Sequence, residues 1–225
     1  MRIDPEGLKI SFAILGCAIM VWVAAMSSGW PVLRWLVAVM VCAGLFSLYF
    51  FRDPERTVPS GEGIAVSAAD GTVVDVRRFP GEGKDGAGRI RIAVFMSVFN
   101  VHVNRTPVDG VVTTKTHRDG KKINALDKRA EYENEHGDTD LATQAGEVRI
   151  RQIAGLIARR VVTRAQVGDS LRAGDRIGLI RFGSRVDVFL PDCYEPAVRP
   201  GERVRAGETV IARIRERSIS GTGGF

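Results

Sequence analysis

The sequence predicts a mainly β protein with an N-terminal α-helical hairpin, and three observations support this fold class. Two long apolar segments fill the first 51 residues. Beyond them, apolar and polar residues alternate over short runs, as they do in half-buried strands. A ten-residue pattern then occurs twice in the C-terminal third, which indicates two similar β lobes. We therefore divide the chain into a hairpin at 1–51 and a β-rich domain at 52–225.

The hairpin is predicted from segments that run from Leu8 to Met26 and from Pro31 to Phe51. Each has about the 20 residues that a helix needs to cross a ~30 Å hydrocarbon core. The Ser-Ser-Gly-Trp stretch between them is typical of a turn. A signal peptide or a buried core hairpin is the alternative. A second apolar segment follows at once, and no clear cleavage site precedes a soluble start, so we expect a membrane hairpin.

Charges flank the hairpin on both sides, with Arg2 and Lys9 before it and Arg52 and Arg56 after it. Positive flanks stay in the cytoplasm, so we expect both ends, and the β domain, on the cytoplasmic side of the inner membrane. The net charge is +6. Arginines crowd the C-terminal end, where they could face anionic lipid, nucleic acid or water. A tethered domain meets lipid headgroups first, so no nucleic-acid partner is expected.

The three cysteines fit neither a disulfide framework nor a zinc site.

Strands are predicted at 73–76, 90–95 and 148–153, where apolar residues alternate with polar ones. Asp-Gly pairs at 70–71 and 109–110 each lead into a Val-rich run, which is a strong hairpin signal. The stretch from Lys115 to Gly146 is highly charged and is expected to be a long loop.

The internal repeat places Gly168–Ile177 beside Gly201–Val210. Each copy has two glycines six residues apart, each followed by an acidic residue, and apolar residues midway and at the end. This pattern is similar to the half-motif of lipoyl- and biotinyl-type barrel-sandwich domains. The lysine carrier of those domains is missing, and Gly183-Ser184 occupies the interval instead. A β-sandwich geometry is therefore expected without a carrier function.

Three polar residues are candidates for a catalytic site: Ser184, His102 and Asp70. A serine hydroxyl becomes a nucleophile when a base lies beside it, and an imidazole oriented by a carboxylate is such a base. Gly183 before the serine allows close approach to its carbonyl. Each residue alone has a structural explanation, since Asp favours turns, a strand His is often structural, and Ser can pack at a bulge.

Together these residues lie in motifs that resemble the phosphatidylserine decarboxylase family, in its short bacterial and archaeal type, over nearly the whole chain. The motifs are Phe51-Arg-Asp-Pro-Glu-Arg56, Ser67-Ala-Ala-Asp-Gly71, Phe95-Met-Ser-Val-Phe-Asn-Val-His-Val-Asn-Arg105, Asn124-Ala-Leu-Asp-Lys128 and Phe182-Gly-Ser-Arg-Val-Asp187.

The resemblance implies a proenzyme that cuts itself at the Gly183-Ser184 bond into a large chain (1–183) and a small chain (184–225). Asp70, His102 and Ser184 would be its self-processing triad. Ser184 would become a covalent pyruvoyl group, the only cofactor, which forms a Schiff base with phosphatidylserine and releases carbon dioxide to leave phosphatidylethanolamine. The two chains would stay together as a heterodimer, and members of the family often self-associate.

Two positions depart from the family pattern. Phe99 stands where many members carry a second histidine, and Asn134-Glu135-His136 replaces an Asn-Glu-Arg motif. His117 and His136 lie in the charged stretch and are expected to be solvated. The three histidines are not spaced as a metal site, and no metal is expected.

Three other functions compete with this interpretation. A membrane-anchored adaptor would explain the hairpin and the repeat, but it gives the three candidate residues no shared task. A membrane serine hydrolase would use the same residues, but the chain lacks a G-x-S-x-G elbow around Ser184. A pyruvoyl decarboxylase of a soluble amino acid would have no need of the membrane hairpin.

Overall fold

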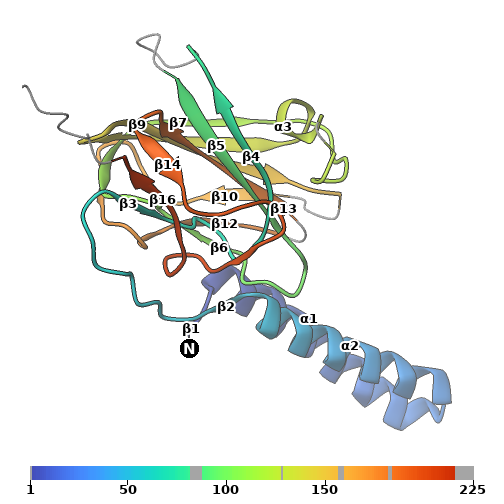
Figure 1. Ribbon diagram of the computed structural model, residues 1–225. Helices are drawn as coiled ribbons and strands as arrows, with labels where there is room; N and C mark the ends of the chain where they lie inside the picture. The colour runs from blue at the N-terminus through green and yellow to red at the C-terminus, as the bar shows by residue number, and fades with distance from the viewer. Residues whose placement is uncertain (1, 82–87, 128, 157–159, 182–183, 216–225) are drawn as a thin grey trace, which may run out of the picture.

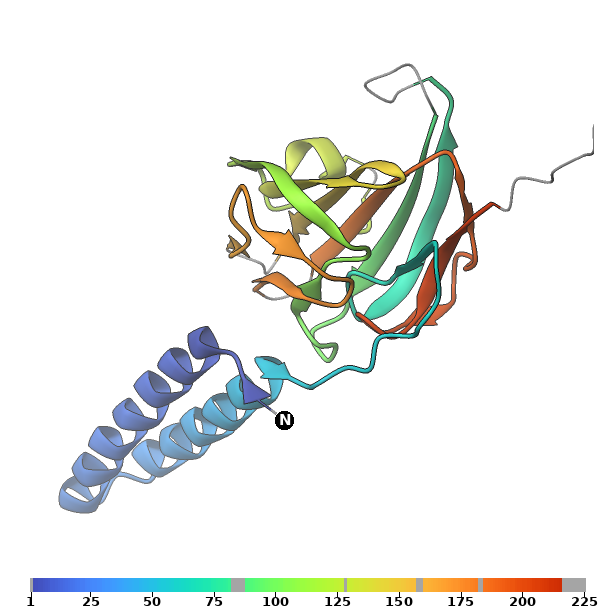
Figure 2. The same ribbon diagram turned by 90° about the vertical axis from the view of Figure 1, so that its left-hand side faces the viewer.

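A computed structural model describes residues 2–81, 88–127, 129–156, 160–181 and 184–215. Two long helices project together from one side of a β domain (Figures 1 and 2). The predicted fold class is confirmed: the molecule is mainly β, with a curled sheet and an N-terminal helical hairpin.

The hairpin consists of α1 (Pro5–Ser28) and α2 (Pro31–Phe50). Asp4 caps α1 by accepting a hydrogen bond from the Glu6 amide at 3.0 Å, and proline fits the first turn of each helix. Gly29 ends α1 with a φ of 68°, a left-handed conformation that suits glycine. Both helices are long and apolar enough to cross a membrane, with mean hydropathies of 2.2 and 1.9, and little of either is buried.

In the described part of the chain, eight strands form the largest sheet, in the order β11-β7-β8-β9-β13-β5-β4-β15. Their bounds are β4 (Gly71–Phe79), β5 (Arg89–Met96), β7 (Gly110–Arg118), β8 (His136–Thr143), β9 (Gly146–Ala154), β11 (Ser170–Leu171), β13 (Ser184–Pro191) and β15 (Arg203–Val204).

Two three-stranded sheets and a short pair complete the fold, in the orders β10-β12-β6, β14-β16-β3 and β1-β2. Their bounds are β1 (Arg2–Ile3), β2 (Arg52–Asp53), β3 (Ile64–Val66), β6 (Val103–Arg105), β10 (Val161–Thr163), β12 (Arg176–Ile180), β14 (Tyr194–Pro196) and β16 (Val210–Ile214). The short helix α3 (Ala130–Glu133) precedes β8. One apolar core is shared between the large sheet and the two smaller ones.

The sheet orders reveal an internal duplication. The large sheet has the same pattern from either edge, with β11, β7, β8 and β9 matching β15, β4, β5 and β13. In the small sheets, β10-β12-β6 matches β14-β16-β3. One unit is the continuous segment β6–β12, and it is inserted into the other unit between β5 and β13. We call the two connections at its ends the junctions: residues 97–102 and 181–183.

Matched hydrogen bonds support the duplication. The Gly168 amide donates to the Val112 carbonyl and the Gly201 amide to the Val73 carbonyl, at 2.9 and 2.8 Å. Asp109 accepts from the Ala173 amide at 2.7 Å, and Asp70 accepts from the Ala206 amide at 2.8 Å. The repeat predicted from the sequence is thus part of a larger structural repeat. This part can be recognised in the sequence because four of its positions have positive φ and therefore favour glycine: Gly168, Gly174, Gly201 and Gly207.

The prediction of hairpin turns at the two Asp-Gly pairs is wrong. Strands are present where expected, but β3 pairs with β16 and not with β4, and β6 pairs with β12 and not with β7. Each Asp-Gly pair instead carries the chain from a small sheet into the large one. A Cβ at Gly71 would lie 2.0 Å from the Phe95 carbonyl oxygen, so glycine is needed there for close approach.

The long loop expected from Lys115 to Gly146 is also wrong, because β7 extends to Arg118 and β8 begins at His136. The acidic residues of β8 made it look like a loop. In the structure Asp138 and Asp140 pair with Arg151 and Arg149 of the neighbouring β9, with contacts of 2.6 to 2.9 Å. Ion pairs across adjacent strands therefore make a charged sequence compatible with a strand.

Ion pairs also fix the hairpin to the β domain. The buried carboxylate of Asp4 accepts two hydrogen bonds from Arg164, at 2.6 and 2.7 Å, and Glu6 contacts Arg181. Beyond the hairpin, Asp53 pairs with both Arg105 and Arg176. The base of the hairpin and the segment that leaves it are thus held against β6, β12, Arg164 and Arg181.

Candidate active site

The three candidate residues lie at the same end of three adjacent strands, β4, β5 and β13. Asp70 directly precedes β4, His102 ends the first junction after β5, and Ser184 is the first residue of β13. Gly183, the other residue of the expected cleavage bond, lies outside the described residues. The first junction lies beside the end of β12, because the Ile180 amide donates to the His102 carbonyl at 3.3 Å. His102 thus ends the first junction, and Ser184 directly follows the second, at the two places where one unit enters the other.

Ser184 is completely buried, and its hydroxyl has no hydrogen-bond partner among the described residues. It lies opposite Met96 on β5 and Ala154 on β9, neither of which offers a polar side chain. A buried hydroxyl without a partner costs about 1–3 kcal/mol, so its presence at a central strand requires an explanation. A free nucleophile explains it well.

His102 is buried, and its ring stacks on Phe50 at the end of α2, with 4.0 Å between ring centroids. Burial, with a smaller contribution from the charge of Arg52, lowers the pKa of His102 to about 4. Nδ1 lies 3.0 Å from the Asn100 carbonyl, which can only accept, so Nδ1 carries the proton. Nε2 is buried, has no partner among the described residues and holds a lone pair. The imidazole is therefore neutral and available as a base.

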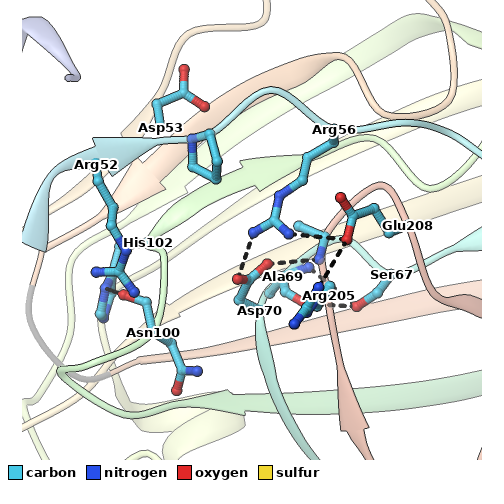
Figure 3. A network of polar contacts seen from close by, with 12 residues as sticks. Arg52, Asp53, Arg56, Ser67, Ala69, Asp70, Asn100, His102, Arg205 and Glu208 are labelled. Carbon is cyan, nitrogen blue, oxygen red and sulfur yellow. Dashed lines mark hydrogen bonds and ion pairs between the residues drawn. The ribbon is translucent and has the colours of Figure 1, made fainter. Parts of the chain in front are cut away.

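Asp70 does not contact His102 in the described structure. Its carboxylate accepts from Arg56 at 2.7 Å and from the Ala206 amide at 2.8 Å (Figure 3). The Ala206 contact repeats the one that Asp109 makes in the other unit, but among the described residues only Asp70 of these two aspartates also pairs with an arginine, the buried Arg56, which pairs with Glu208 as well. Asp70 thus holds a turn of the fold, in addition to any part it has in chemistry.

The hairpin shapes the junction that carries His102. The side chains of Tyr49 and Arg52 both donate to the Phe99 carbonyl, at 3.3 and 2.6 Å. The ring of Phe99 packs edge-on against Phe46 of α2 and remains 65% exposed. An aromatic side chain in this place suits a membrane interface.

Sequence reasoning missed a buried polar chain next to Ser184. Gln152 donates to Asn104 at 2.8 Å and accepts from Thr163 at 2.8 Å, while Asn104 contacts the Met96 sulfur at 3.6 Å. Asn104 and Gln152 are fully buried. The only sequence signal was the position of Asn104 two residues after His102.

The expectation for the other histidines was half right. The His117 side chain is 47% exposed. His136, expected to be solvated, is buried at the start of β8, and its Nδ1 lies 2.8 Å from the Asn134 carbonyl. It is buried because the presumed loop is a strand of the large sheet.

Comparison with known proteins shows the family to which this chain belongs. The family model described as "Phosphatidylserine decarboxylase" matches residues 43–212. A phosphatidylserine decarboxylase proenzyme of Oleidesulfovibrio alaskensis is 45% identical over 216 residues, 95% of each chain. Proenzymes of the same name from Nitratidesulfovibrio vulgaris and Ruegeria pomeroyi are 43% and 42% identical, over 223 and 214 residues. These alignments cover 95% and 93% of this chain, and 95% and 94% of the relatives.

The chain is therefore an enzyme, a decarboxylase with two helices that suit a membrane. It belongs to the phosphatidylserine decarboxylase family, and its length matches that of its relatives, which confirms the resemblance to the short type.

The Phe50 ring should keep His102 neutral. In Phe50→Leu the imidazole gains access to water, so its pKa should rise from about 4 toward its ordinary value of 6.5. Titration of the histidine Cε1 signals by NMR in detergent micelles measures this, with His102→Gln assigning the signal. Phe46→Leu, which alters ring contacts with Tyr49, Phe50 and Phe99 but leaves the Phe50 ring stacked on His102, is the control. An unchanged pKa in Phe50→Leu would remove the ring from this role.

Proposed function

We propose that this chain converts phosphatidylserine to phosphatidylethanolamine with a pyruvoyl group that it makes by cutting itself between Gly183 and Ser184. The observation that carries the proposal is that two buried atoms, Ser184 Oγ and His102 Nε2, have no hydrogen-bond partner in the part of the chain that the structure describes. The names of the relatives support the substrate and the proenzyme state.

Self-cleavage begins when His102 Nε2 takes the Ser184 hydroxyl proton and Ser184 Oγ attacks the Gly183 carbonyl carbon. The peptide C–N bond breaks as an ester forms, and the proton on His102 passes to the freed amine. Removal of the Cα proton of residue 184 then breaks its Cβ–Oγ bond and releases the Gly183 carboxylate. Water replaces the nitrogen of the resulting dehydroalanine, and ammonia leaves. A pKa well below 7 keeps His102 in the form that can accept the proton.

The pyruvoyl group supplies a carbonyl that condenses with the substrate amine and accepts the electron pair left when carbon dioxide departs. The buried, apolar surroundings of residue 184 fit this group, since Met96 and Ala154 on either side exclude water. His102 would take a proton released by the substrate amine on condensation and deliver it to the substrate carbon after carbon dioxide leaves. Asp70 would turn toward His102 only after leaving Arg56.

We also propose that the hairpin spans the inner membrane, with the β domain on the cytoplasmic side. The loop with Phe99 would then lie at the headgroup level, because it packs against the end of α2. A lipid substrate needs such a position, whereas a soluble one does not.

Ser184→Ala should remain a single chain of 24.5 kDa, because alanine has no hydroxyl to attack with. Wild-type protein should give masses for 1–183 and 184–225, and an amine with borohydride should label the small chain. Ser170→Ala, which alters an exposed serine, should process normally. Cleavage of Ser184→Ala at the same bond would show that the nucleophile is wrong.

Asp70→Asn should slow cleavage by about 10²-fold or more, since general base catalysis contributes about 10²–10⁴-fold. Asparagine can still accept from the Ala206 amide, so the turn is kept while the charge is lost. Asp109→Asn is the matched control, because Asp109 makes the equivalent contact in the other unit. His102→Gln should also block cleavage. Equal rates for Asp70→Asn and Asp109→Asn, measured by gel densitometry, would exclude Asp70 from the mechanism.

The small chain should stay bound after cleavage. Its first strand, β13, pairs with β5 on one side and β9 on the other, while β15 and β16 pair with β4 and β3. Both chains should therefore elute together on gel filtration in detergent and 1 M salt, and separate only in denaturant. Separation under native conditions would contradict the central position of β13.

A further inference from the structure

A basic cavity lies beside the second junction. Its volume is about 420 Å³, and β7, β10 and the start of α1 contribute to its walls. The charged and ring side chains that line it are Glu6, Lys115, His117, Arg160 and Arg181. Three permanently cationic side chains thus surround the space, against one carboxylate.

The single carboxylate is already engaged. Glu6 contacts Arg181 and also lies 3.8 Å from Lys9. Lys115 donates to the Thr163 carbonyl and the Gln166 side chain, both neutral acceptors, at 3.0 and 3.4 Å. Within the described residues, neither Lys115 nor Arg160 has a carboxylate partner. The cavity therefore has an excess of positive charge, which an anion would neutralise.

Arg181 offers a further unused donor. Its Nε is buried and has no hydrogen-bond partner among the described residues, although its guanidinium reaches Glu6. A buried N–H without a partner is costly, and a phosphate oxygen in the cavity would satisfy it.

The cavity borders the reaction centre on two sides. Arg181 precedes Ser184 by three residues, which span at most about 10 Å. Thr163 lines the cavity and bonds to Gln152, which lies opposite Val186, two residues after Ser184 on the same strand. A ligand whose anionic group is bound in the cavity can thus place another of its atoms, a few bonds from that group, beside residue 184.

The cavity also lies at the level of the hairpin base, because Glu6 is in the first turn of α1. If α1 enters the bilayer from this end, the cavity opens at the headgroup layer. A phosphodiester attached to a lipid is the anion found at that depth.

We propose that this cavity binds the phosphodiester of the aminophospholipid headgroup, with Arg160, Lys115 and Arg181 as its ligands. The headgroup amine, two carbons beyond the phosphate oxygen, then reaches residue 184. The inference rests on the proposed function for the identity of the substrate, and on the cavity alone for phosphate binding.

Arg160→Gln tests the proposal, since Arg160 is exposed and its loss leaves the fold intact. In the mature enzyme the KM for phosphatidylserine in mixed micelles should rise about tenfold with kcat unchanged, the effect of losing one charge-assisted contact. Arg118→Gln is the control. It removes the same charge from an exposed side chain at the end of β7, which does not line the cavity. Equal KM values for the two variants would overturn the proposal.

A second readout does not depend on turnover. Phenylglyoxal modifies exposed arginines, and mass spectrometry of the full-length protein follows Arg160. Short-chain phosphatidylethanolamine, the unconsumed product, should protect Arg160 at concentrations where inorganic phosphate does not. Equal protection by inorganic phosphate, or none by the lipid, would overturn the cavity assignment. An enzyme that produces no phosphatidylethanolamine but shows lipid protection would instead overturn the proposed function and leave the cavity assignment standing.

Discussion

The double pairing of β13 is the constraint on which the rest of the site depends. From Ser184 onward this strand is hydrogen-bonded to β5 along its full length and to β9 along most of it. That pairing holds residue 184 at a fixed, dry position whatever happens to the chain before it. It also offsets the cost of a buried hydroxyl without a partner, which a loop could not do.

The helical hairpin is part of the same construction and more than an anchor. Phe50 forms one wall around His102, and Tyr49 and Arg52 hold the carbonyl of the preceding junction. Burial, to which the Phe50 ring contributes, lowers the pKa of the imidazole. One aromatic contact thus links the hairpin to the protonation state of His102.

Local patterns in the sequence were sufficient for part of this structure. The hairpin follows from two apolar segments, and β4, β5 and β9 follow from alternation, because both signals are contained in a few adjacent residues. Pairing partners are not local, so the Asp-Gly pairs were read as hairpins. β8 was missed because the residues that neutralise Asp138 and Asp140 lie on another strand.

In the candidate site, too, some features could be predicted from the sequence and others depend on contacts between distant residues. Motif resemblance predicted Ser184 and His102, and the structure buries both, His102 at the end of the first junction and Ser184 directly after the second. The same resemblance implied contact between Asp70 and His102, whereas the carboxylate faces Arg56, a residue whose role only the folded chain reveals. Asn104 and Gln152 were overlooked because an amide pair between distant strands leaves no pattern in the sequence.

The inserted unit begins and ends on neighbouring strands, since Val103 pairs with Leu179. Two separate half-size chains could thus build the same sheets, with β5 joined directly to β13 as β8 is joined to β9. Such a symmetric assembly would lack both junctions. Each of its residues would occur twice, in two identical environments. In a single chain the residues at the two junctions are free from that symmetry, so Ser184 and His102 need no equivalent in the other half.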